Sequence, residues 1–334
     1  MYALRLVGPS QLVEVEIPAL SEHSHKGLIE VRLSAAGICG SDLPHFRTPA
    51  ADVEAGYPIH ECVGRVVSLA GGQAATGPRL AIGDRVVAMP VGKRGLAEIY
   101  LARPEATHRV VDVSLTDGQA TLIQPLATVQ HAVSRLGEVE GARVAIIGLG
   151  PIGLLAAHLL RRRGASHIIG IEPADRGQLA ALVGVDVVTG PGREAEEVIR
   201  CSPMIDVCVE AVGHQTNTLA DAVTFTGFGG AILALGVPND EDYVWPFRHF
   251  FRKNLTLHAS VNPPWRPAMA AAEEYLTRHR STLTGLITHN FDIREGNRAF
   301  DLYASRSPGR GKVVLNADSW TDRRRSLCDQ MTRS

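Results

Sequence analysis

The residues with the clearest chemical potential are a cysteine and a histidine–glutamate pair in the first quarter of the chain. Cys39 stands in the stretch Gly-Ile-Cys-Gly-Ser-Asp at 37–42, and His60 and Glu61 begin 21 residues after Cys39. Thiolate, imidazole and carboxylate are ligands that zinc takes in proteins, and a catalytic site leaves one position for water or substrate. Buried thiols and hydrogen-bonded core histidines use the same residue types, so this spacing by itself leaves the metal site open.

A second motif lies in residues 144–158, where an apolar run of strand length ends at a glycine and a helical pattern follows. Its three glycines form the pattern G-x-G-x-x-G. The first permits a tight turn, the second lets a pyrophosphate approach the backbone, and the third lets the helix pack on the strand. The helix N-terminus would offer free N–H groups to the phosphates. The residues predicted to surround the cofactor there are Gly148, Leu149, Gly150, Pro151, Ile152 and Gly153.

Glu172 strengthens the prediction of a dinucleotide site. It ends a second apolar run 19 residues after Gly153, near the spacing of about 20 residues in the dinucleotide-binding fingerprint. Glycine turns can serve packing alone, but strand, turn, helix, strand and acid occur here in order. A carboxylate at this position accepts the ribose hydroxyls and repels a 2′-phosphate, which favours NAD over NADP. Arg176 is close enough in sequence to pair with such a phosphate instead.

The composition is that of a globular protein with two domains. The chain has 334 residues, more than the ~250–300 residues of the usual single core. Its net charge of −1 gives no sign of the basic surface that binds nucleic acid, so we expect a small neutral or weakly charged substrate.

The five cysteines are too scattered along the sequence for a disulfide framework. The sequence shows neither the layout of a signal peptide nor an apolar run near the ~20 residues of a membrane span, so we expect a cytoplasmic protein.

The spacing of apolar residues predicts two kinds of architecture. Residues 2–101 hold short alternating runs separated by turn residues, which predict a β-rich domain. A helical period over 118–136 then leads into six apolar runs that alternate with helical segments, which predict an α/β, doubly wound, six-stranded parallel sheet. The six runs are 144–148, 168–172, 186–189, 205–212, 231–237 and 255–261.

The C-terminal part returns to mixed structure. Residues 267–280 predict a helix, and 286–291 and 312–315 predict strands. The stretch 318–334 is polar and contains three consecutive arginines. In a chain of this low net charge, we interpret it as a solvated tail rather than a nucleic-acid-binding arm.

Together these motifs resemble the zinc-dependent medium-chain alcohol and polyol dehydrogenases. The shared features are Gly-Ile-Cys-Gly-Ser-Asp at 37–42, His-Glu at 60–61, Gly-Asp-Arg-Val at 83–86 and the glycine turn, in that order. The resemblance runs from Tyr2 to about Asn316. Three stretches look most like the sugar (glucose-type) dehydrogenase branch of the family: 89–91, 122–128 and 259–262.

The resemblance implies a fold of two parts. A Rossmann dinucleotide-binding domain would span 127–263, and a discontinuous GroES-like catalytic domain would span 1–126 and 264–334. Family dimers usually join at the sheet edge that residues 255–261 would form here. The resemblance therefore also implies a homodimer or a homotetramer.

The zinc site follows from the same resemblance, with Cys39, His60, Glu61 and Gln124 around the metal. Glu61 or Gln124 would exchange with water. The neutral amide of Gln124 is a weaker ligand than the Cys or Glu usual in the family, so participation of Glu61 would restore the charge. Zinc would act as a Lewis acid that lowers the pKa of the substrate alcohol.

Residues beside the metal would handle the proton. Ser41 resembles the family hydroxyl that relays the proton to the cofactor ribose. Asp42 would hydrogen-bond the far nitrogen of His60 and fix its tautomer. His45 is either an exit for the proton or a residue of a surface loop.

The remaining cofactor-binding residues come from separate parts of the chain. Thr128 and Asn262 resemble residues beside the nicotinamide, and each is also explained as a capping or turn residue. Val212 completes the predicted cofactor-binding set, together with the glycine turn, Glu172 and Arg176.

Departures from the family pattern bear on the metal and the substrate. Residues 89–98 pass directly to the next strand without the four cysteines that hold a structural zinc, so we predict a catalytic zinc only. Gly92 stands where the sugar branch commonly has an Asn that meets substrate hydroxyls, which argues against glucose. Ile59 replaces the usual glycine before His-Glu. Its side chain leaves less room around the backbone beside a metal ligand.

The sequence therefore predicts a zinc-dependent, NAD(P)-dependent dehydrogenase. It would oxidise a secondary alcohol of a polyol, sugar or cyclitol-like metabolite, or reduce the ketone, by hydride transfer. Two alternatives are a zinc-free reductase of the same fold acting on an activated double bond, and a nucleotide-sensing protein without activity. A sensor would not need Cys39, Ser41 and His60 together.

Overall fold

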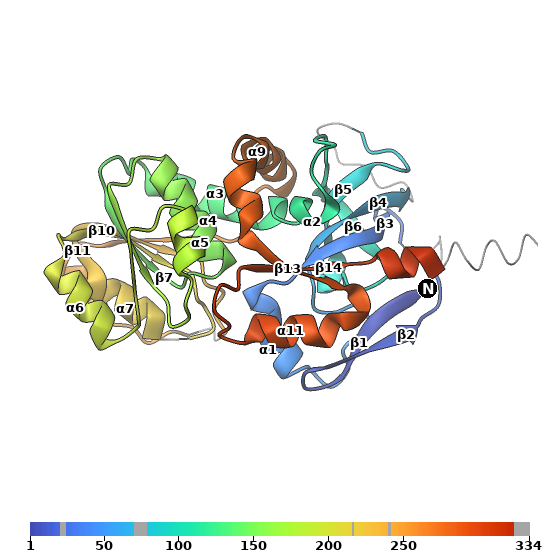
Figure 1. Ribbon diagram of the computed structural model, residues 1–334, viewed down its shortest axis with the longest axis horizontal. Helices are drawn as coiled ribbons and strands as arrows, with labels where there is room; N and C mark the ends of the chain where they lie inside the picture. Colours follow the sequence, from blue (N-terminus) through green and yellow to red (C-terminus); the bar gives the residue numbers. More distant parts are fainter. Residues whose placement is uncertain (21–24, 70–78, 216, 240–241, 324–334) are drawn as a thin grey trace, which may run out of the picture.

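The computed structural model describes residues 1–20, 25–69, 79–215, 217–239 and 242–323. Two six-stranded sheets lie side by side along the long axis of the molecule (Figure 1). The middle of the chain, coloured green to yellow, builds one lobe. The N-terminal third, in blue to cyan, shares the other lobe with the orange to red C-terminal segment.

The sheet of the first lobe is parallel throughout, with the order β12-β11-β10-β7-β8-β9. The chain starts at the centre with β7, builds outward to one edge, and returns to build the other half. The point where the direction reverses lies between β7 and β10, and in such sheets ligands bind at the carboxyl ends of the strands there. The strands are β7 (Arg143–Ile147), β8 (His167–Ile171), β9 (Val187–Thr189), β10 (Ile205–Glu210), β11 (Thr226–Ala234) and β12 (Thr256–Ala259).

The predicted six-stranded, doubly wound sheet is thus confirmed, with shifted boundaries. The strand predicted over 231–237 starts at Thr226 and ends at Ala234. The strand predicted over 205–212 ends at Glu210, whose side chain accepts hydrogen bonds from the N–H groups of Val212 and Gly213, each at 2.9 Å. These side-chain bonds hold the chain in a turn and stop the strand.

Helices cover both faces of this sheet, and each face has its own apolar core. Helix α4 packs against β7 and β10, and α7 packs against β10 and β11. The helices of this lobe are α4 (Pro151–Arg162), α5 (Gly177–Leu182), α6 (Arg193–Cys201), α7 (Asn217–Phe225) and α8 (Phe247–Arg252).

The second sheet has the order β13-β14-β3-β4-β5-β6, and an additional pairing of β3 with β6 curls it toward a barrel. The hairpin of β1 and β2 lies beside it, and α11 packs on β13 and β14. This confirms the expected β-rich domain. Its elements are β1 (Tyr2–Gly8), β2 (Gln11–Glu16), β3 (Ile29–Gly37), β4 (Glu61–Ser68), β5 (Arg85–Pro90), β6 (Ile99–Arg109), β13 (Ile287–Asp292), α11 (Gly296–Ala304) and β14 (Lys312–Asn316).

Two helices join the lobes. Helices α3 (Ile123–Val133) and α9 (Trp265–Arg278) pack on each other, α3 also contacts α4, and α9 also contacts β6. The helix predicted over 118–136 is interrupted after α2 (Asp117–Ala120), because Pro125 has no N–H to donate to the carbonyl of Thr121. One apolar cluster contains residues of β4, β5, α3, α4 and α9, so the core is continuous across the junction.

The beginning of the C-terminal stretch differs from the prediction. Residues 318–323 are helical, and Trp320 is 1% exposed, with its indole N–H donating to Glu14 at 2.8 Å. Arg323 pairs with the same carboxylate at 2.7 Å. The prediction of a solvated tail is wrong for these residues, because a tryptophan buries its apolar surface against the β1–β2 hairpin. Arg324 and the rest of the predicted tail lie outside the described residues.

Two further findings bear on the class of protein. Cys39, Cys62, Cys201 and Cys208 are free thiols, and Cys328 lies outside the described part of the chain. Among the helices that the structure describes, none has both the length and the apolar character that a bilayer crossing requires.

Candidate metal and cofactor site

A tight turn after β3 fixes the first group of predicted site residues. Cys39 precedes a short 3-10 helix, Gly40–Asp42, which runs directly into α1 (Leu43–Arg47). The carboxylate of Asp42 accepts the backbone N–H of Cys39 at 2.9 Å. This bond closes the turn and holds Cys39, Ser41 and Asp42 within one helical turn, with Ser41 and Asp42 buried.

Antiparallel pairing then brings the second group to the first. Strand β4 begins at Glu61, which lies opposite Gly37 at the end of β3. This pairing therefore brings Cys39 and His60 together, although 21 residues separate them along the chain. The metal-ligating atoms of Cys39, His60 and Glu61 lie within 4.8 Å of one another.

The donor chemistry of this cluster fits a divalent zinc ion. His60 Nδ1 lies 3.0 Å from the carboxylate of Asp42, which is fully buried, so the other ring nitrogen is free to serve as a ligand. Burial opposes a charge on His60, but the charge of Asp42 and hydrogen bonds to Asp42 and Cys39 raise its pKa well above the usual value. The Ser41 hydroxyl donates to Cys39 Sγ at 3.5 Å. The structure thus brings together Cys39, Ser41, Asp42, His60 and Glu61.

Glu61 has a partner that the sequence reasoning missed. Lys312 of β14 forms a salt bridge with Glu61, and each side chain is only 1% exposed. The ammonium of Lys312 also donates to the carbonyl of Ile38 at 3.0 Å. A Cβ on Gly37 would lie 2.5 Å from the Glu61 carboxylate and 2.7 Å from Lys312 Cε, so only glycine leaves room for this pair. A lone lysine beginning the apolar run Lys-Val-Val-Leu is the signal that could have revealed it.

Gln124, the fourth predicted metal ligand, lies in the first turn of α3 and is 5% exposed. Its Nε2 donates to the hydroxyl of Thr128 at 3.4 Å, and that hydroxyl donates to the carbonyl of Gln124 at 3.3 Å. Gln124 and Thr128 therefore occupy one buried face of α3.

The backbone of the glycine turn has the geometry that the sequence predicted at each of its three glycines. Gly148 has a φ of 91°, and Gly150 precedes the first residue of α4, with Pro151 at that first position. A Cβ on Gly153 would lie 1.8 Å from the carbonyl oxygen of Gly148, so the helix approaches the turn too closely for a side chain. The space beside Gly150 is open, which is the room that a pyrophosphate needs to reach the backbone.

Glu172 and Arg176 occupy different environments. Glu172 follows β8 and accepts the N–H of Leu149 at 2.9 Å and that of Ala174 at 3.1 Å. Arg176 is 2% exposed and donates to the carbonyl of Ser307 at 2.7 Å. Burial lowers its pKa, as does the nearby Arg310, and its guanidinium lies 4.0 Å from Glu172.

The other predicted cofactor residues follow strand ends. Val212 comes after β10, and a Cβ on Gly148 would lie 2.7 Å from its side chain, so the two residues adjoin. Asn262 is exposed and follows β12. Because β7, β10 and β12 are parallel, these positions share the carboxyl edge of the sheet with the glycine turn.

The loop after β5 is short, as its sequence predicts. A 3-10 turn, Val91–Lys93, connects β5 to the chain leading into β6 without a cysteine. Gly92 is exposed, and Ile59 is fully buried, with its carbonyl accepting the N–H of Gly95 at 3.1 Å. His45 is half-buried on α1 rather than in a loop, and its ring meets that of Tyr57 edge-on at 5.1 Å.

Two family models match this chain over most of its length. Residues 119–307 match a family model described as glucose dehydrogenase C-terminus, and residues 25–132 match one described as alcohol dehydrogenase GroES-like domain. The chain is 28% identical over 359 residues to a sorbitol dehydrogenase of Bombyx mori, covering 95% of this chain and 99% of that protein. It is 26% identical over 344 residues to an L-threonine 3-dehydrogenase of Caldanaerobacter subterraneus subsp. tengcongensis, covering 92% and 95%.

The fold is shared with alcohol dehydrogenase TADH from Thermus sp. ATN1, with a TM-score of 0.79 and 24% sequence identity over 95% of this chain and 100% of that one. The chain therefore belongs to the medium-chain, zinc-dependent alcohol and polyol dehydrogenase family. It is an oxidoreductase that acts on CH–OH groups, in a family that uses zinc and a nicotinamide cofactor. The resemblance predicted from the sequence is confirmed.

The Glu61–Lys312 pair gives a prediction for stability. The substitution Lys312→Met keeps the length of the side chain but leaves the Glu61 charge buried without its partner. We expect a loss of about 3–5 kcal/mol in the free energy of unfolding. Urea denaturation of the chelator-treated protein measures this loss.

Two further variants control for the substitution. The double variant Lys312→Met/Glu61→Gln removes the stranded charge and should recover most of the stability. Arg278→Met breaks an exposed ion pair with Glu274 and should cost less than about 1 kcal/mol. Wild-type stability of the single Lys312 variant would contradict the pairing.

Proposed function

We propose that this protein oxidises a secondary alcohol of a polyol, sugar or cyclitol-like metabolite with NAD, or reduces the corresponding ketone, at a single catalytic zinc. The observation that carries the proposal is the approach of three ligand atoms, from Cys39, His60 and Glu61, to within 4.8 Å. A partly buried imidazole held by a buried carboxylate, beside a thiol and a second buried carboxylate, is a costly arrangement, and zinc coordination would explain it.

We assign the residues of this chain to the following tasks. Cys39, His60 and either Glu61 or Gln124 would hold the metal, and Asp42 would orient His60 through its Nδ1 contact of 3.0 Å. Zinc supplies a Lewis acid for the substrate oxygen when bound. Ser41 would accept the proton of the substrate hydroxyl and pass it toward the cofactor ribose.

On the cofactor side, the glycine turn would bind the pyrophosphate at the N-terminus of α4. Thr128 would lie beside the nicotinamide, since it shares a buried face of α3 with Gln124. Val212 and Asn262 would line the same space from the carboxyl edge of the sheet. We place this cofactor domain over 127–263 and the catalytic domain over 1–126 and 264–334.

The substitution Cys39→Ser tests the catalytic zinc. A hydroxyl is a far poorer zinc ligand than a thiolate, so we expect loss of both bound zinc and alcohol oxidation. Metal analysis of the purified protein and NADH formation with a panel of polyols measure the two effects. Cys201→Ser, at an exposed cysteine in α6, is the matched control and should keep both.

The proposal fails if the Cys39 variant retains full turnover. A zinc-free wild-type protein that reduces an enone would instead support the alternative reductase.

We propose NAD rather than NADP as the cofactor. Glu172 directly follows β8, at the position that meets the adenosine ribose in this fold, and its carboxylate would repel a 2′-phosphate. Arg176 does not offset this charge for a ligand, since its guanidinium is buried and donates to Ser307.

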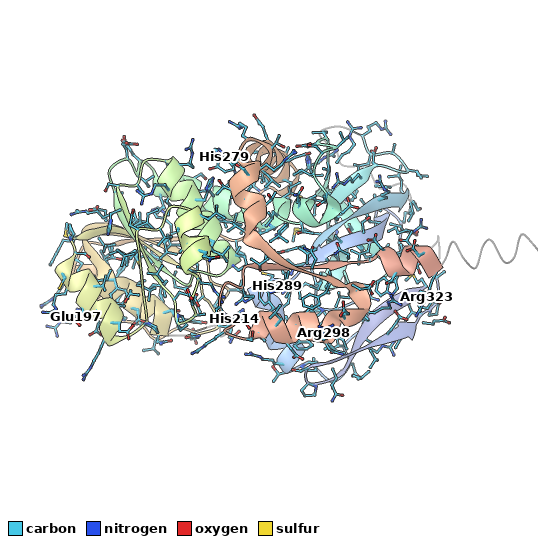
Figure 2. The ribbon with its side chains drawn as sticks, viewed as in Figure 1. Glu197, His214, His279, His289, Arg298 and Arg323 are labelled. Carbon is cyan, nitrogen blue, oxygen red and sulfur yellow. The ribbon has the colours of Figure 1, made fainter. Side chains whose placement is uncertain are left out.

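The substitution Glu172→Ala should lower the ratio of kcat/KM for NAD to that for NADP by about tenfold or more, the effect of one lost hydrogen bond to a charged group. Glu197→Ala is the control for loss of a negative charge, because Glu197 lines the same cavity as Glu172. Figure 2 labels Glu197, which lies in the lobe of the parallel sheet. An unchanged ratio in the Glu172 variant, or an equal change in both variants, would remove this role from Glu172.

We also propose that the protein forms a homodimer or homotetramer through the edge of β12. Among the residues that the structure describes, β12 is an edge strand of the parallel sheet. Exposed apolar side chains occur in β12 and in the segments on either side of it, and we refer to them as the apolar patch: Val244, Phe247, Phe251, Leu257 and Val261, between 37% and 92% exposed.

Light scattering should give a mass of two or four times 35.8 kDa. The substitution Phe251→Glu places a charge in the patch and should lower that mass to a single chain. Val113→Glu, at a residue that is 94% exposed outside the patch, should leave it unchanged. A monomeric wild-type protein would contradict this assembly.

A further inference from the structure

The end of α4 carries three consecutive arginines, and the structure pairs only two of them. Arg161 forms a salt bridge with Asp186. Arg163 donates to the carbonyl of Val133, at the end of α3, at 2.6 Å. Arg162 is exposed, and neither a salt bridge nor a hydrogen bond joins it to another residue that the structure describes. The guanidinium of Arg162 is therefore available to a ligand.

Arg162 lines a cavity where α3, α4 and α9 meet. The cavity has a volume of about 340 Å³, which is room for about ten water molecules at ~30 Å³ each. Helix α3 contributes Gln130 and Val133, α4 contributes Leu159 and Arg162, and α9 contributes Tyr275. Of the described residues that line the cavity, none is acidic, and none belongs to the predicted metal or cofactor set.

Polar atoms without partners gather at this junction of helices. Gln130 Oε1 and Tyr275 Oη are buried and have no hydrogen-bond partner in the described part of the chain. The same holds for Nε2 of His158, whose ring meets that of Tyr275 edge-on at 5.8 Å. His279 (Figure 2) completes the cluster, with its ring centroid 4.3 Å from that of Tyr275. Buried polar groups are nearly always hydrogen-bonded, so these atoms indicate a polar occupant of the cavity.

The protonation states of these groups define what they can bind. Burial raises the pKa of Tyr275, and the charges of Arg162 and Arg278 offset this only in part, so the hydroxyl keeps its proton at neutral pH. Burial lowers the pKa of His158 to about 4, and the charges of His279 and Arg162 add to the effect. His158 is therefore neutral, and the charge at the cavity comes from the arginines of α4.

The balance of charge at the cavity favours an anion. The C-terminal ends of α3 and α4 oppose one, because the two helix dipoles together place about −1 elementary charge there. Arg162 and Arg163, which both line the cavity, each contribute a full positive charge. Arg278 does not line the cavity, and it is paired with Glu274 at 3.1 Å. About one positive charge is left over, which fits a monovalent anion.

We propose that this cavity is a second binding site, separate from the metal and cofactor sites, for a small monocarboxylate that also carries an N–H or O–H donor. Arg162 would pair with the carboxylate, and the hydroxyl of Tyr275 would donate to it. The donor of the ligand would meet Gln130 Oε1, and its carbon chain would lie against Val133 and Leu159. Such a ligand would contact all three helices that join the lobes.

Ligand-detected NMR titration of the zinc-loaded protein with NADH tests this site. The probes are succinamate, succinamide and succinate, which share a four-carbon chain and have no alcohol group to be oxidised. Succinamate should bind about 10- to 100-fold more tightly than the neutral succinamide, the effect of hydrogen bonds to a charged group. It should also bind more tightly than succinate, which has a second charge in place of the amide donor.

Variants of the lining residues locate the binding. Arg162→Gln, at an exposed position, should weaken succinamate about tenfold. Tyr275→Phe deletes only a hydroxyl without a partner, so it should weaken succinamate about two- to tenfold and leave the midpoint of urea unfolding unchanged. Arg278→Gln removes the neighbouring arginine that is paired with Glu274, and as the matched control it should not change the dissociation constant.

The proposal is wrong if succinamate binds no more tightly than succinamide, or if Arg162→Gln leaves its dissociation constant unchanged. Equal weakening by Arg162→Gln and Arg278→Gln would show a general attraction of charge and would exclude a specific site. Tighter binding of succinate than of succinamate would contradict a site for one negative charge, and a lower unfolding midpoint of Tyr275→Phe would show that the hydroxyl has a structural partner. These readouts do not involve alcohol oxidation, so they are independent of the proposed reaction.

Discussion

The register between β3 and β4 is the constraint on which the site depends. Gly37 lies opposite Glu61, so the turn that carries Cys39 closes over the residues that begin β4. A slip of one residue would turn the side chains of β4 to the other face of the sheet. The buried pair of Glu61 and Lys312 fixes the same register from the opposite side, because β14 pairs with β3 at Gly37. Three strands are thus held together at the point where the candidate metal ligands Cys39, His60 and Glu61 meet.

The two lobes are held together because the helices between them belong to one core. Helix α3 presents Gln124 and Thr128 on a buried face, while its apolar residues pack against both α4 and α9. Buried Glu273 of α9 accepts the N–H groups of Val111 and Asp112, each at 2.7 Å, and contacts His108 at 2.6 Å. These bonds satisfy a buried carboxylate and fasten α9 to the end of β6. The helix that connects the lobes is therefore fixed to the catalytic side.

The sequence determined the features that repeat over short distances. Apolar runs of strand length, the glycine turn and the acid after β8 depend on local periodicity and spacing, so they predicted the parallel sheet and the nucleotide side of the site. Strand ends were less certain, because side chains such as Glu210 can end a strand by bonding backbone N–H groups. Trp320 was misjudged for a related reason, since its polar neighbours in sequence hid the apolar surface it buries.

Only the tertiary structure decided which residues, distant in the sequence, form a buried ion pair. Lys312 is 251 residues from Glu61 along the chain, yet the two side chains form a buried salt bridge. A sequence motif records the residue types that a reaction needs, but the partner of a buried charge is set by which strands pair and which loops meet. Burial makes an unpaired charge costly, so the fold selects those partners through desolvation, an effect that no local pattern expresses.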